Sequence, residues 1–168
     1  MEERESKFNI VGVESRHELR AVQCLLLEYW QSFGFDLEFQ GFSAELAALP
    51  GNYARPAGRL GLAKMDEDAA GCIALRRVDE RRCEAKRLYV RDQFRGRGIA
   101  RALLTWLIEE ARAAGYKEMV GDTMPGMSRA LAMYERLGFR RVGPYAAEPT
   151  PGAIYLSLNL QPDNYRSA

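Results

Sequence analysis

Two spacings of apolar residues alternate along the chain, and each predicts a different kind of element. Apolar residues at steps of three and four predict amphipathic helices, whereas short apolar runs between turn residues predict strands. Helices are expected from Ser15 to Gly34 and over Phe42–Leu49, Ile99–Ala114 and Ser128–Leu137. Strands are expected over Phe8–Val13, Gly58–Lys64, Ala70–Val78, Glu84–Val90, Tyr116–Asp122, Phe139–Val142 and Ala153–Leu160.

Polar residues and glycines mark the expected helix ends. Ser15 and Glu18 have the spacing of a capping box, in which two side chains satisfy free amides at a helix start. Ser128 is expected to cap the last helix. Gly115 and Gly138 follow the last apolar positions of their helices and are expected to end them.

The order of these elements predicts an α/β fold with a mixed sheet and helices packed on it. The polar turn MDEDA after Lys64 predicts that the strands on either side of it form an antiparallel hairpin. The strand, long helix and strand around Ile99–Ala114 predict a right-handed crossover at the centre. A length of 168 residues fits one domain, residues 1–168.

Charge and hydropathy exclude two classes of partner. Lys and Arg number 24 and Asp and Glu number 23, so the net charge is +1 and no bulk field attracts nucleic acid or an anionic membrane. No apolar run approaches the roughly 18 residues needed to span a bilayer, and the N-terminus lacks the apolar core of a signal peptide. We therefore expect no nucleic-acid partner, no membrane partner and a cytoplasmic location.

Cysteine and histidine are too few for a metal centre. Cys24, Cys72 and Cys83 form no CxxC pair and lie in hydrophobic stretches, which predicts reduced, buried thiols. His17 is the only histidine, so no zinc site built from His and Cys is expected. The single histidine also argues against a Ser-His-Asp hydrolase.

The segment Gln93–Ala100, with sequence QFRGRGIA, lies between an expected strand and the first turn of the longest expected helix. Amides at a helix start lack internal partners and carry partial positive charge, so they bind anions. Gly96 and Gly98 let the backbone close on phosphate oxygens, and Arg95 and Arg97 add charge. The segment is therefore predicted to hold a phosphate group.

Two common phosphate loops do not fit this segment. A dinucleotide fingerprint requires Gly where Arg101 stands, and a P-loop requires Gly-Lys-Ser/Thr at its end. The pattern that remains is Q-x-x-G-x-G. It resembles the acetyl-CoA pyrophosphate loop of the GNAT superfamily of N-acetyltransferases.

A second segment strengthens the resemblance. Ala130–Phe139, with sequence ALAMYERLGF, is similar to the A-x-x-L-Y-x-x-x-G-F helix of the same family. The resemblance covers roughly Cys72–Phe139, with Met133 in place of the commoner Leu. Met127 stands where many relatives carry an Asn that contacts the cofactor.

The resemblance implies a GNAT-like fold of mostly antiparallel strands, with acetyl-CoA as acyl donor and an amine of a small molecule or peptide as acceptor. Tyr134 is implied to protonate the departing thiolate, and the Val90 amide to bind the oxyanion. Many members are dimers, and the resemblance leaves a homodimer open. The residues implied to bind acetyl-CoA are Leu88, Tyr89, Val90, Gln93, Arg95, Gly96, Arg97, Gly98, Ile99 and Ala100.

Glu84 is the leading candidate for the general base, acting directly or through water. By simple alternation it shares a strand face with Lys86, Leu88 and Val90. The alternative is a surface salt bridge to Lys86 or to Arg82. Both interpretations are kept open.

Two further residues near this site are given lesser roles. Asp122 could attract a cationic acceptor, but a capping role near Ser128 is favoured. Cys83 could accept the acetyl group in a double displacement, but no cation or helix start that would activate its thiol is expected nearby. Direct transfer is therefore preferred.

The main alternative function is a non-catalytic acyl-CoA sensor that keeps the loop and no longer transfers the group. Met127 supports it, whereas Tyr134 and Glu84 argue against it. The identity of the amine is not encoded in either motif. It is expected to depend on the first two helices and on the segment Tyr145–Gly152.

Overall fold

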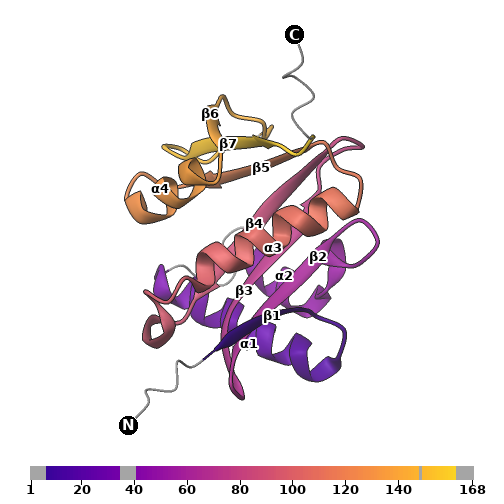
Figure 1. The fold of residues 1–168 in the computed structure, drawn as a ribbon, viewed down its shortest axis with the longest axis vertical. Coiled ribbons are helices and arrows are strands. Elements are labelled where there is room, and N and C mark those ends of the chain that lie inside the picture. Colours follow the sequence, from indigo (N-terminus) through magenta and orange to yellow (C-terminus); the bar gives the residue numbers. More distant parts are fainter. Residues whose placement is uncertain (1–6, 35–40, 148, 162–168) are drawn as a thin grey trace.

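The computed structural model describes residues 7–34, 41–147 and 149–161, and in these residues the strands form one seven-stranded sheet (Figure 1). The order across the sheet is β1-β2-β3-β4-β5-β7-β6. The strands are β1 (Phe8–Gly12), β2 (Arg59–Met65), β3 (Asp68–Arg77), β4 (Arg82–Val90), β5 (Glu118–Thr123), β6 (Arg140–Val142) and β7 (Ile154–Asn159). The helices are α1 (Arg16–Ser32), α2 (Phe42–Ala48), α3 (Ile99–Ala113) and α4 (Ser128–Arg136), with short 3-10 turns η2 (Gly51–Tyr53) and η3 (Asp92–Phe94).

Strand pairing confirms the mixed α/β fold. β1 to β4 pair antiparallel in sequence order, and β7 pairs antiparallel with both β5 and β6. β4 and β5 pair parallel. A parallel pair needs a long connection that returns to the same end of the sheet, and α3 provides it. The expected strand–helix–strand crossover is therefore present.

Helices cover both faces of the sheet and form two hydrophobic cores. α3 packs on one face, where Leu103, Leu104 and Leu107 are fully buried. α1 and α2 cover the other face, with Leu25 and Trp30 at its centre. Each such side chain contributes about 1.5–3 kcal/mol by leaving water. Packing therefore fixes α3 against the sheet and with it the position of its N-terminus.

The helix ends agree in part with the sequence. The capping box of α1 is present, since the Glu18 amide donates to Ser15 Oγ over 3.1 Å and the Ser15 amide donates to Glu18 Oε2 over 3.0 Å. α4 differs, because its N-cap is Met127 and no side chain caps it. Ser128 is thus the first helical residue, and its expected capping role is wrong. No helix in the described ranges is both long enough and apolar enough to cross a bilayer.

The cysteines are also only partly as expected. Cys72 and Cys83 are buried in the two cores, but Cys24 is exposed. The prediction for Cys24 is wrong because the residue falls on the outer side of α1, between the buried positions Val22 and Leu25.

β4 contains a bulge close to its middle. Lys86 pairs with Ala74, whereas Tyr89 pairs with Cys72, so β4 has one residue more than β3 across this interval. Arg87 has φ +61°, in the left-handed region. An extra residue and an unusual backbone conformation are the two marks of a β-bulge.

The bulge overturns the expectation that Glu84, Lys86, Leu88 and Val90 share one face. Leu88 and Val90 belong to the core under α3, as does Cys83. Because side chains alternate along a strand, Glu84 and Lys86 lie on the opposite face from Cys83. Simple alternation fails because the extra residue exchanges the two faces beyond it.

Candidate active site

The turn between β4 and α3 presents unpaired backbone amides. Gly96 and Gly98 have φ values of +77° and +79°, and Gly98 is the N-cap of α3 without a side-chain cap. The first amide bonded back to this cap is that of Ala102, which donates to the Gly98 carbonyl over 3.0 Å. The amides of the helix's first turn therefore point out of its start, where the helix dipole favours an anion.

Side chains around this turn contribute unequally. Gln93 and Arg97 are exposed, whereas Ile99 is buried beneath α3 and leaves only its backbone for a ligand. Arg95 Nε donates to the Val90 carbonyl over 3.0 Å, and its Nη1 lies 2.8 Å from Asp92 Oδ1. Arg95 thus braces the turn against the end of β4.

β4 and β5 separate beyond a short paired stretch. They pair only from Arg82 to Glu84 on β4, among the described residues, and diverge beyond it (Figure 1). The Arg91 amide donates to the Ala70 carbonyl of β3 over 2.9 Å. Amide directions alternate along an antiparallel strand, so the Val90 amide points away from β3 and toward the gap.

A cavity of about 440 Å³ lies where the two strands have separated. Its walls come from α1, α2, β3, β4, β5, α4 and β7, and from the connections between β5 and α4 and between β6 and β7. Its aromatic lining includes Tyr29, Trp30, Phe42, Tyr134, Tyr145 and Tyr155, and its charged lining is Arg76, Glu84, Lys86, Arg87 and Asp122. The cavity is therefore lined largely by aromatic side chains, and its charged side chains come from β4 and the neighbouring strands β3 and β5.

Tyr134 reaches this cavity from α4. Its ring packs edge-on against Phe139, with the ring centroids 5.1 Å apart. Its hydroxyl makes no hydrogen bond within the described ranges. Burial raises the pKa of Tyr134 above its ordinary value, and the nearby hydroxyl of Tyr29 and the carboxylate of Asp122 add to the rise. The hydroxyl is therefore protonated at neutral pH and free to donate.

Glu84 reaches the cavity from β4 and is only 3% exposed. Arg76 Nε donates to its Oε1 over 2.6 Å, and Tyr145 Oη donates to its Oε2 over 2.8 Å. Lys86 Nζ lies 3.8 Å from the same Oε1, and Arg82 pairs instead with Asp79. The ion pair considered between Glu84 and Lys86 is therefore present, but it is buried and not at the surface, and the pair considered with Arg82 does not form.

Two neighbours of Glu84 have shifted pKa values. Burial lowers the pKa of Lys86, and the attraction of Glu84 offsets only part of this. Burial also raises the pKa of Tyr145, and the adjacent Glu84 carboxylate raises it further. Tyr145 thus stays a neutral hydroxyl.

Arg87, the bulged residue of β4, forms an ion pair with Glu45 of α2. Its Nε and Nη2 donate to the two carboxylate oxygens of Glu45, each over 2.8 Å. The guanidinium lies over the rings of Trp30 and Phe42, at 5.5 and 5.1 Å from their centroids. α2 and the bulge are held together at the edge of the cavity.

Comparisons with known proteins agree with this arrangement. Residues 21–139 match the acetyltransferase (GNAT) family. The chain belongs to that family. It is 34% identical over 157 residues to an uncharacterized N-acetyltransferase of Schizosaccharomyces pombe, covering 92% of this chain and 96% of the relative.

Solved structures show the same fold. An acetyltransferase from Streptococcus agalactiae superposes with a TM-score of 0.76 at 20% identity, covering 90% of this chain and 98% of the other. A GNAT family acetyltransferase from Elizabethkingia anophelis, solved with acetyl-CoA bound, gives a TM-score of 0.61 at 23% identity, covering 93% and 99%. This GNAT protein is accordingly an acetyltransferase.

The structure of this acetyltransferase brings only some of the expected site residues together. Tyr134, Glu84 and Leu88 line one cavity. Tyr89 points away from it, with its ring 5.5 Å from that of Tyr29 and its hydroxyl donating to Glu28 over 3.5 Å. Of Tyr89, only the backbone remains available to a ligand lying in the gap.

Asp122 differs from the favoured sequence prediction, whereas Cys83 is a buried, free thiol as predicted. Asp122 lines the cavity and caps nothing, since α4 has no side-chain cap. Cys83 lies in the core under α3, where burial raises its pKa to about 12. Its thiol is therefore neutral and faces away from the cavity.

Sequence reasoning missed two partners of Glu84. Arg76 lies directly across the β3–β4 hairpin from it. The DERR turn at residues 79–82 connects the two strands, so its position in the sequence would have predicted that Arg76 lies opposite Glu84. Tyr145 is 61 positions away and no local pattern connects it to Glu84.

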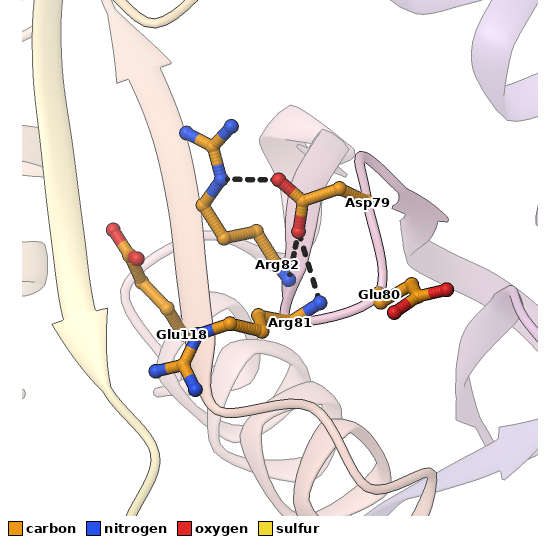
Figure 2. Close-up of a pocket in the computed structure, with 5 residues that line it drawn as sticks. All are labelled: Asp79, Glu80, Arg81, Arg82 and Glu118. Carbon is orange, nitrogen blue, oxygen red and sulfur yellow. Dashed lines mark hydrogen bonds and ion pairs between the residues drawn. The ribbon is translucent and has the colours of Figure 1, made fainter.

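A second hollow lies at the turn between β3 and β4 (Figure 2). Figure 2 shows the Asp79 carboxylate accepting from the Arg82 side chain and from the amides of Arg81 and Arg82. These bonds, the Arg82 side chain first, lower the pKa of Asp79 to about 2. The hollow is at the opposite end of β4 from the phosphate-binding turn, about 25 Å away along an extended strand. Within it Asp79 pairs with Arg82, and it shares no lining residue with the cavity that contains Glu84 and Tyr134.

Proposed function

We propose that this enzyme moves the acetyl group of acetyl-CoA directly to the amine of a small molecule or peptide. One observation carries the proposal: the free amides at the start of α3 and the cavity that contains Tyr134 lie along the same open edge of β4. That arrangement suits a long ligand with an anionic end and a reactive end.

The cosubstrate would lie along this edge. The pyrophosphate would accept hydrogen bonds from the amides after Gly98, with Arg97 and Gln93 at the surface beside it. The pantetheine arm would follow β4 past Val90, whose amide faces the gap. The thioester would then enter the cavity near Leu88 and Tyr134.

Transfer requires a neutral amine that attacks the thioester carbon. As the C–N bond forms, the carbonyl oxygen becomes an oxyanion, and a fixed amide such as that of Val90 stabilises the developing charge. As the C–S bond breaks, the thiolate takes the proton of Tyr134, whose hydroxyl has no other partner in the described residues. The carboxylate of Glu84 is the general base that accepts a proton from the incoming amine.

The acceptor remains open between a small amine and a peptide terminus. Asp122 is exposed at the cavity, which favours an amine that arrives as a cation. Direct transfer is favoured over an acetyl-cysteine intermediate, because Cys83 is neutral and faces the other core. A homodimer and a cytoplasmic location stay predictions.

The function is tested by thiol release from acetyl-CoA across a panel of amines. The Tyr134→Phe variant is expected to lose turnover by about 10²-fold or more, as for removal of a general acid. Its affinity for coenzyme A is expected to stay within a factor of two of the wild type, because the cavity that Tyr134 lines includes none of the residues 93–100 that form the proposed pyrophosphate turn.

Two outcomes would contradict this assignment. Turnover of Tyr134→Phe at the wild-type rate would remove its role as acid. Tight binding of acetyl-CoA without thiol release from any amine would favour the acyl-CoA sensor instead.

A further inference from the structure

Two tyrosines line the cavity with different hydrogen-bond partners. Tyr145 Oη donates to Glu84 Oε2 over 2.8 Å, whereas the Tyr134 hydroxyl has no partner in the described part of the chain. An ionised carboxylate accepts hydrogen bonds but cannot donate them. The proton of Tyr145 is therefore directed at Glu84, and its oxygen is left to accept from a ligand. Tyr134, in contrast, can donate.

Glu84 itself is shielded from a ligand in the cavity. Its carboxylate is 3% exposed, with Arg76 on Oε1 and Tyr145 on Oε2. Because Glu84 is almost fully buried, an amine could touch the carboxylate directly only if the side chains that cover it moved. The Tyr145 oxygen offers a route that leaves both bonds in place.

Tyr145 is held firmly and is neutral. Its ring packs edge-on against Tyr155, with the centroids 5.1 Å apart. Burial and the neighbouring carboxylate of Glu84 raise its pKa, so it passes a proton on without remaining ionised. The charged and titratable groups that share its cavity wall are Tyr29 of α1, Arg76 of β3, Glu84, Lys86 and Arg87 of β4, Asp122 of β5, Tyr134 of α4 and Tyr155 of β7.

We propose that Tyr145 relays a proton from the acceptor's ammonium group to Glu84. This inference rests on the proposed amine acetylation. The ammonium N–H gives its proton to Tyr145 Oη while the O–H proton of Tyr145 passes to Glu84 Oε2. The amine becomes neutral, Tyr145 regains a proton, and Glu84 becomes a carboxylic acid that later returns its proton to solvent.

The second half of the reaction then balances with the other tyrosine. The neutral amine forms the C–N bond, the C–S bond breaks, and the thiolate takes the proton of Tyr134. The proton that leaves the nitrogen as the amide forms restores Tyr134. Tyr145 thus takes a proton from the acceptor and Tyr134 gives one to the thiolate, because, of these two hydroxyls, only that of Tyr145 is hydrogen-bonded to a carboxylate.

The relay is tested by kcat/KM against pH, using an amine with a known solution pKa that supports thiol release. Below that pKa the amine arrives as ammonium, and Tyr145→Phe is expected to lose about 10²-fold. Above that pKa the amine arrives neutral, so the loss is expected to shrink toward none. The double variant Tyr145→Phe with Glu84→Gln is expected to lose no more than either single variant, because both changes break one relay.

A matched control separates the relay from packing. Tyr116→Phe also removes one buried hydrogen bond, from its hydroxyl to the Ala57 carbonyl at 2.7 Å, outside the cavity. Its pH profile should match the wild type. Coenzyme A affinity of Tyr145→Phe should also match, which shows that the variant is folded.

A loss in Tyr145→Phe that is the same at every pH, or no loss at all, would overturn the relay while leaving the acetylation proposal intact. Additive losses in the double variant would also overturn it. A wild-type enzyme that releases no thiol with any amine would refute the proposed function, and the relay with it.

Discussion

At the scale of single residues, the turn proposed to bind the pyrophosphate depends on a backbone conformation that side chains disfavour. Gly98 has φ +79°, and a Cβ added there would meet no atom within 4 Å. Glycine is therefore required by the left-handed conformation and not by crowding, and a residue with a Cβ pays about 1–2 kcal/mol there. The free amides of α3 exist in their present direction only while Gly98 keeps this conformation.

Gly98→Ala is accordingly expected to lower the free energy of unfolding by about 1–2 kcal/mol and to weaken coenzyme A binding roughly tenfold. Urea unfolding and titration with coenzyme A measure the two effects. Gly143→Ala is the control, since Gly143 has no positive φ and open space around it. Equal coenzyme A affinity in Gly98→Ala and wild type would show that the turn does not hold the ligand.

At the scale of elements, the sequence predicts most of the fold but not the shape of β4. Periodicity and end signals located the strands and helices because apolar spacing depends on local geometry alone. The bulge at Arg87 has no such signal, because an arginine at φ +61° is stable only through distant partners. Those partners, Glu45 and the rings of Trp30 and Phe42, come from α1 and α2. The loop at Gly96–Gly98 and Tyr134 could be predicted because each belongs to a local sequence motif. The contact between Tyr145 and Glu84 could not, because the two residues are far apart in the sequence.

The Glu45–Arg87 pair therefore predicts a measurable coupling between α2 and β4. Burial works against the charge of Glu45, but the hydrogen bonds and charge of Arg87, together with the hydrogen bond from Tyr53 and the charge of Lys86, outweigh it and lower the pKa of Glu45. Glu45→Gln leaves the Arg87 charge partly buried without its anion, so the free energy of unfolding should fall by about 1–3 kcal/mol. Glu109→Gln, which removes an exposed pair with Arg112, should change it by less than about 0.5 kcal/mol. Similar small losses in both variants would mean that the buried pair does not hold α2 in place.

At the scale of the whole molecule, the proposed active site lies where the sheet is incompletely paired. Among the described residues, β4 and β5 share only the short pairing from Arg82 to Glu84, and the cavity opens beyond it (Figure 1). Unpaired backbone at the centre of a sheet is costly unless another group satisfies it. A ligand that bonds to the open edge of β4 would satisfy it and join the two parts of the sheet.

Coenzyme A is therefore expected to stabilise the protein and to protect particular amides from hydrogen exchange. At one hundred times the dissociation constant, binding adds about 2.7 kcal/mol to the free energy of unfolding. The amides of Val90, Ile99 and Ala100, for which the described residues offer no partner, should show the largest slowing of exchange. Amides within the β1–β2 pairing, which is complete without ligand, should change little beyond the global effect. If the slowing were uniform, or centred on the turn at Asp79, coenzyme A would not lie along the open edge of β4, because only direct hydrogen bonding protects those amides selectively.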